Sequence, residues 1–163
     1  MYDIFDVRNN SNAGLQDFFI HDRLPTDAAR GVRLITGTYN ERLTYRITYR
    51  TNLNSKYVVL AENLSTRNSY EYSLHPNALG LRSNEYVTEV RLEFGSVGPG
   101  FRMVDNLKIF VQVLPTVPAD YKIINRANVG GRYLEEWETA NTSATTTVWR
   151  EPEPEIPLPR TGY

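Results

Sequence analysis

Side chains that could act as acids, bases or nucleophiles are sparse in this sequence, and they form no recognisable catalytic motif. The chain has no cysteine, which excludes thiolate catalysis, Cys-ligated zinc and disulfides. Its two histidines, His21 and His75, lie far apart and lack the spacing of metal ligands. His21 precedes Asp22 at the expected end of a strand, where we expect it to act as a polar cap. No Gly-x-Ser-x-Gly segment could form a nucleophile elbow, so we expect no catalytic residues and no enzyme activity.

Acidic residues are numerous, but their spacing is typical of a solvated surface. The densest groups are Glu135, Glu136 and Glu138, and then Glu151, Glu153 and Glu155. Calcium requires about six to eight oxygen ligands, which proteins often supply from an Asp-x-Asp-x-Asp loop. The candidate aspartates do not form such a loop: they are Asp3, Asp6, Asp17 and Asp22. We therefore expect no metal site and no cofactor.

Eleven tyrosines and two tryptophans leave a sugar-binding role open, because aromatic faces can stack on pyranose rings. Tyr45, Tyr49 and Tyr86 fall on the apolar face of regularly alternating segments, so we expect them in the core. The pattern does not place the remaining candidates, which are Tyr70, Tyr72, Tyr133, Trp137 and Trp149. A carbohydrate-binding module that uses exposed aromatics is therefore the alternative function.

Alternation of apolar and polar residues is the dominant signal along the chain. It is strictest at residues 42–50, 86–94 and 107–113, which predicts half-buried strands. Less regular strands are expected at residues 2–7, 15–21, 32–38, 56–61, 68–74, 121–129, 131–137 and 142–150. Gly, Asn, Ser and Pro clusters predict the turns between them, at residues 9–14, 51–55, 95–100 and 130–131. About eleven short strands at turn spacing indicate an all-β sandwich without helices.

The composition changes after Arg150. Residues 151–157 alternate glutamate with proline, and proline removes backbone donors and favours an extended segment. We therefore predict a β-sandwich module at residues 1–150 and a Pro/Glu stalk at residues 151–163.

The stalk ends in a short motif that is known from surface proteins. Residues 158–162 match, position by position, the LPxTG sorting signal of Gram-positive cell-wall proteins; they are Leu158, Pro159, Arg160, Thr161 and Gly162. The resemblance implies that a sortase cleaves between Thr161 and Gly162 and joins Thr161 to peptidoglycan or to a pilin subunit. It also implies an extracellular location at the cell-wall surface. Such signals normally continue into an apolar span and a basic tail, so we expect a longer protein.

The body of the chain carries a second resemblance. Residues 2–11 and 15–25 resemble the opening strands of the conserved-repeat immunoglobulin-like domains of bacterial surface proteins, with an Asn-rich turn and then Asp-x-Leu-Pro. Residues 123–129 and 140–148 resemble the closing strands. The match covers about residues 2–27 and 120–149. Residues 30–114 lie outside it, and we expect them to hold extra strands that enlarge the sandwich or form an inserted lobe.

Many sortase-anchored β-sandwiches contain an internal Lys–Asn isopeptide bond, which requires a lysine amine made neutral by burial. This chain offers Lys56, Lys108 and Lys122. Lys108 alternates away from an apolar face, whereas Lys122 lies between Tyr121 and Ile123 where it could be buried. Lys122 is therefore the candidate isopeptide lysine.

The charge balance limits the expected partners. A net charge of -1 gives no basic excess to attract nucleic acid or anionic lipid, and no apolar stretch predicts a membrane span. The resemblance to LPxTG proteins implies a structural or adhesive module whose partners are sortase, the cell wall or pilus, and a host or glycan ligand.

Overall fold

Twelve β-strands make up the fold of the computed structural model, which describes residues 2–4, 7–9 and 13–147. The described residues contain no α-helix. The strands are β1 (Tyr2–Ile4), β2 (Leu15–Arg23), β3 (Ala29–Ile35), β4 (Thr38–Tyr39), β5 (Thr44–Thr51), β6 (Asn54–Ser65), β7 (Glu71–Ser73), β8 (Val87–Val97), β9 (Met103–Asp105), β10 (Leu107–Val113), β11 (Lys122–Tyr133) and β12 (Glu136–Thr147). The prediction of an all-β sandwich is confirmed.

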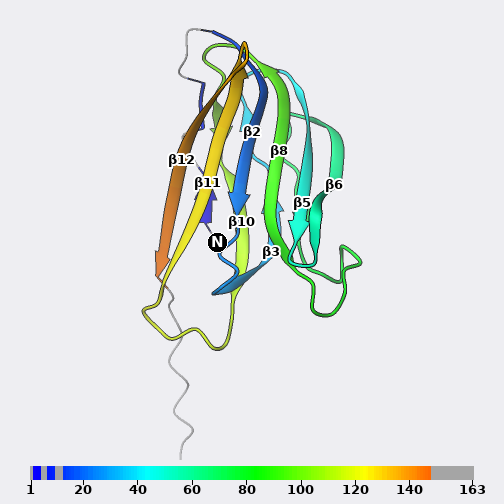
Figure 1. Ribbon diagram of the computed structural model, residues 1–163, viewed down its shortest axis with the longest axis vertical. Helices are drawn as coiled ribbons and strands as arrows, with labels where there is room; N and C mark the ends of the chain where they lie inside the picture. The colour runs from blue at the N-terminus through cyan, green and yellow to red at the C-terminus, as the bar shows by residue number, and fades with distance from the viewer. Residues whose placement is uncertain (1, 5–6, 10–12, 148–163) are drawn as a thin grey trace, which may run out of the picture.

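Two antiparallel sheets form the layers of the sandwich. The larger has six strands in the order β12-β11-β2-β8-β5-β6, and the smaller has four in the order β1-β10-β3-β7. Figure 1 shows the six-stranded sheet in front, with β3 and β10 behind it. A short pair, β4 and β9, forms a third, two-stranded sheet. Most strands from residues 30–114 lie in the same two sheets as the flanking strands and enlarge the sandwich, whereas β4 and β9 pair with each other.

The core lies between the two large sheets, where alternation places one face of each strand. Ile20 and Leu92 come from the six-stranded sheet, Leu34 and Ile109 come from the four-stranded sheet, and all four are almost fully buried. An aromatic cluster fills part of this interior; its members are Phe18, Tyr39, Tyr45, Phe94 and Phe101. The expected core positions Tyr45 and Tyr49 are buried, whereas Tyr86 is half-buried and lies beneath the Arg30 guanidinium.

The two glycines at positions 130 and 131 do not form the expected turn. Strand β11 continues through them, and the chain reverses at Leu134 and Glu135. A Cβ on Gly130 would lie 2.8 Å from the Glu138 carbonyl oxygen and 3.0 Å from the Phe19 ring. The glycines therefore allow close approach within the sheet. The predicted separate strand at residues 131–137 is wrong for this reason.

The described part of the chain contains no helix that is long and apolar enough to span a membrane.

Candidate functional site

The predicted sorting signal lies outside the described residues, as does the Pro/Glu segment before it. This holds for Leu158, Pro159, Arg160, Thr161 and Gly162. The last described strand is β12, which forms one edge of the six-stranded sheet and ends at Thr147. Strand β12 is therefore the described strand that precedes residues 158–162 in the sequence.

Lys122, the candidate isopeptide lysine, begins β11 opposite Thr147. Its side chain is exposed, whereas the next residue, Ile123, is buried in the sandwich. Lys122, which could have been buried, is thus exposed, because alternation along β11 turns its amine toward solvent.

His21 lies within β2 and on the outer face of the six-stranded sheet, not at a strand end as expected. Its Nε2 is 2.9 Å from Glu89 Oε1 and 3.4 Å from the Tyr57 hydroxyl. Among the described residues these are its only hydrogen-bonding partners, so no hydroxyl nucleophile of a Ser–His–Asp type is placed beside it. Burial lowers the pKa of His21, and this effect outweighs the attraction of Glu89. Burial thus favours the neutral imidazole.

Glu89 is buried despite its charge, on the face of β8 opposite the apolar residues. Its carboxylate accepts an ion pair from Arg50 at 3.1 Å and lies 3.5 Å from the Arg23 Nε. These cations come from β5 and β2, the two strands that flank β8 in the sheet. The arrangement compensates the charge and locks three neighbouring strands together.

A second buried polar pair lies inside the sandwich. The Asn125 amide donates a hydrogen bond of 2.9 Å to the Asp22 carboxylate, and both residues are nearly inaccessible. Asp22 belongs to the Asp-x-Leu-Pro segment and Asn125 to the predicted closing strand. Their contact joins β2 to β11, which are directly paired. In the sequence, only the resemblance of these two segments to immunoglobulin-like repeats pointed to this pair.

A hollow opens at one end of the six-stranded sheet, where the backbone is irregular. Asp17 on β2 and Asn63 on β6 have positive φ angles of 50° and 55°, and Gly95 on β8 has 74°. The pairing of β2 with β8 also shifts register beside Phe18. Such bulges bend strands and turn side chains in new directions. They accompany a depression of about 400 Å³, which we call the sheet hollow.

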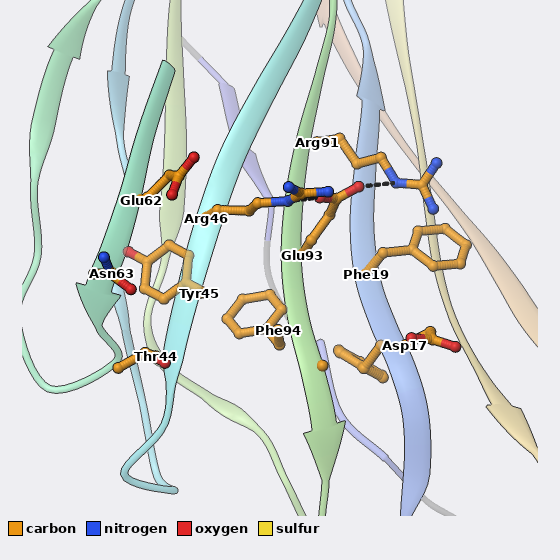
Figure 2. A pocket seen from close by; sticks show the side chains of 12 residues that line it. Asp17, Phe19, Thr44, Tyr45, Arg46, Glu62, Asn63, Arg91, Glu93 and Phe94 are labelled. Carbon is orange, nitrogen blue, oxygen red and sulfur yellow. Dashed lines mark hydrogen bonds and ion pairs between the residues drawn. The ribbon is translucent and has the colours of Figure 1, made fainter. Parts of the chain in front are cut away.

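Charged side chains surround the sheet hollow in alternating sign, as Figure 2 shows. Glu93 on β8 is contacted by Arg46 on β5, and its other carboxylate oxygen is 3.6 Å from the Arg91 Nε. The Arg91 guanidinium also lies 4.5 Å from the centre of the Phe19 ring. Glu62 and Asp17 complete the charged lining, and Asp17 pairs with Arg132 at 3.0 Å. Tyr45 lies on the inner floor of the hollow. Burial raises the pKa of its hydroxyl to about 12, so the side chain is uncharged at neutral pH.

The aromatic residues considered for sugar binding separate into three groups. Tyr70 and Tyr72 stack on each other and pack against the core. Trp137 and Tyr133 are exposed on the β11–β12 hairpin, with 55% and 45% of their surface accessible. Trp149 lies outside the described residues. Only two of the five candidates are thus shown to be exposed.

Trp137 and Tyr133 lie on opposite faces of the hairpin. Trp137 is the cross-strand partner of Arg132, whereas Tyr133 is the partner of Glu136. Since neighbouring residues of a strand point to opposite faces, only one of the two rings can face the sheet hollow. That ring is Trp137, which lies 6.2 Å from Phe19.

No group of three or more histidines or acids in the described residues is placed to hold a metal ion. Comparison with known proteins adds no assignment, because no family model, no curated protein and no solved structure matches the chain.

Proposed function

We propose that this chain is a non-enzymatic structural and adhesive module of a Gram-positive surface protein, which a sortase attaches covalently through Thr161. The observation that carries the proposal is the Leu158–Gly162 sequence, LPRTG, which follows an acidic, proline-rich segment. Proline and like-charged glutamates favour an extended peptide, which a sortase must thread through its groove. The acceptor would be peptidoglycan or another pilin subunit, at the extracellular face of the cell wall.

The fold is compatible with such a role. The signal follows β12, an edge strand that pairs with β11 over its whole length. Any load applied at Thr161 would enter the module through this hairpin and then through β2. We further propose that the sandwich is related to immunoglobulin-like repeats of surface proteins, which is supported by the pairing of the two motif-bearing segments in β2 and β11.

A transpeptidation assay tests the attachment. Incubation with sortases of several classes and an oligoglycine or pilin-type lysine nucleophile should release Gly162-Tyr163 and leave the nucleophile amide-bonded to Thr161. Mass spectrometry of the product and of its C-terminal peptide gives the site. Pro159→Ala and Thr161→Ala should reduce transfer strongly, because the enzyme recognises the bend at one position and cleaves after the other.

Arg160→Ala is the matched control for this assay. The third position of the signal is variable, so this variant should react at nearly the parental rate. Equal transfer by the Thr161→Ala variant, or no transfer from the parent with any sortase class, would exclude the proposed attachment.

Carbohydrate binding is a second candidate function. The observation that favours it is Trp137, a large ring that is mostly exposed and lies beside the sheet hollow.

A further inference from the structure

We propose that the sheet hollow is a binding site for an uncharged saccharide, with the Trp137 ring as a stacking surface at its side. The inference deepens the adhesive part of the proposed function and rests on it, but it does not depend on attachment by sortase. The volume of the sheet hollow, about 400 Å³, lies within the range of small-molecule sites. The hollow is also the place where strand irregularities from β2, β6 and β8 meet. Strained backbone of this kind is concentrated at functional sites.

The charges of the hollow are balanced, which argues for a neutral ligand. Arg46 and Arg91 both lie beside Glu93, while Asp17 is paired with Arg132 and Glu62 adds one further carboxylate. Two guanidiniums and three carboxylates line the hollow, and a third guanidinium, that of Arg132, neutralises Asp17 from outside the lining. Neither an anion nor a cation would gain a strong net attraction here.

The same groups suit a ligand rich in hydroxyls. A hydroxyl both donates and accepts hydrogen bonds, so it can bridge a guanidinium and a carboxylate that lie side by side. Ion pairing holds the Arg46 and Glu93 side chains in place before a ligand arrives, which lowers the entropic cost of binding.

The aromatic side of the hollow supplies an apolar surface. Phe19 lines the hollow, and Trp137 lies next to it with a tilt of 59° between the rings. The C–H face of a pyranose could pack on the exposed indole while its hydroxyls reach the charged groups.

An extended peptide is a poorer fit. Peptides commonly bind sheets by adding a strand to a free edge. The hollow lies on β2, β8 and β5, which have hydrogen-bonded neighbours on both sides, and on β6, which is an edge strand. The backbone groups of the three inner strands are therefore already used, and these strands offer a ligand only their side chains.

Binding can be measured on the whole chain with a panel of neutral oligosaccharides of glucose, galactose, mannose and the N-acetylhexosamines. Sulfated and sialylated glycans are tested in parallel as charged ligands, and a collagen-like triple-helical peptide is tested as a peptide ligand. We expect saturable binding of at least one neutral oligosaccharide by calorimetry. Trp137→Ala and Arg46→Ala should each weaken it by about tenfold or more, as is common for aromatic and arginine contacts at the centre of a site.

Two matched controls come from the same chain. Tyr133→Ala removes an exposed ring from the opposite face of the same hairpin. Arg33→Ala removes an arginine of the four-stranded sheet that also pairs with a glutamate, Glu71, and lies over a phenylalanine, Phe110. Both variants should bind like the parent, and thermal melting should show that all four are folded.

Several outcomes would overturn the inference. These are binding of no neutral oligosaccharide, equal loss in the control variants, binding of sulfated or sialylated glycans alone, or binding of the peptide alone. Each of them leaves the transpeptidation result unaffected, so failure of the saccharide site and failure of sortase attachment are distinguishable.

Discussion

Most enclosed carboxylates in this structure have a partner on a neighbouring strand. Glu89 forms an ion pair with Arg50, and Glu93 forms one with Arg46. Asp22 accepts a hydrogen bond from Asn125. Burying a charge is costly unless it is paired and hydrogen-bonded, so each pair constrains which strands lie side by side. These contacts specify strand order as well as adding stability.

The Asp22–Asn125 pair gives a direct test of this idea. Replacing Asn125 with alanine removes the amide that donates to a buried carboxylate, so we expect the free energy of unfolding to fall by about 2–4 kcal/mol. Urea denaturation at pH 7 measures the change. Asn128→Ala, a change to a half-buried amide on the same strand, should cost far less. Equal costs would show that the buried pair has no special role.

The half-buried His21 predicts a pH dependence of stability. Burial lowers the pKa of His21 below its usual value, so the folded state binds fewer protons than the unfolded chain once the pH falls below about 6.5. The free energy of unfolding should therefore decrease on acidification from pH 7.5 to 5.5. His21→Gln should reduce that decrease, as measured by urea titrations at both pH values.

His75→Gln serves as the control, because His75 is exposed in a turn. It should retain the parental pH dependence. If His21→Gln loses as much stability on acidification as the parent does, then His21 is not the group responsible.

Sequence reasoning reached these residues only in part. The alternation at residues 86–94 correctly placed Val90, Leu92 and Phe94 inside, and it assigned Glu89 to the opposite face. Burial of Glu89 on that face could not be foreseen, because it depends on which strands flank β8. The sheet hollow likewise combines residues from β2, β5, β6 and β8, whose adjacency is not encoded in local spacing.

The β11–β12 hairpin shows how a single close contact determines the behaviour of an element. Gly130 and Gly131 have the composition of a turn, but they lie in a strand because the Phe19 and Leu15 side chains approach the backbone there. Local propensity favoured a turn, and tertiary packing prevailed. The actual turn, at Leu134 and Glu135, has no glycine and places Leu134 at a φ of 56°.

Adding one methyl group at this point should therefore destabilise the sheet. In Gly130→Ala the new Cβ would approach the Glu138 carbonyl oxygen to 2.8 Å and the Phe19 ring to 3.0 Å. We expect a loss of about 1–3 kcal/mol, typical of overpacking, measured by urea denaturation. Arg126→Ala, at an exposed position of the same strand, should change stability by no more than about 0.5 kcal/mol. A neutral Gly130→Ala variant would mean that the hairpin shifts easily.

At the scale of the whole molecule, strands from the early and late parts of the described chain meet. Strand β2 lies between β11 and β8, so residues from both ends of the sequence share the six-stranded sheet with strands from its middle. Period-two alternation predicted the existence of the strands and the all-β class. It could not predict their order, because strands of the same pattern are interchangeable until long-range contacts such as Asp22–Asn125 distinguish them.

This arrangement predicts where the stable module ends. Strand β12 pairs with β11 as far as Thr147, whereas residues 151–157 are a glutamate–proline alternation with little apolar area to bury. Deleting residues 151–163 should leave the Tm unchanged within about 1 °C, as measured by calorimetry. Deleting residues 142–163 should instead lower it by many degrees, because the half of β11 that pairs with this part of β12 would lose its edge partner. A fall of several degrees with the shorter deletion would show that the Pro/Glu segment docks on the sandwich, and a peptide docked in that way would be less accessible to a sortase.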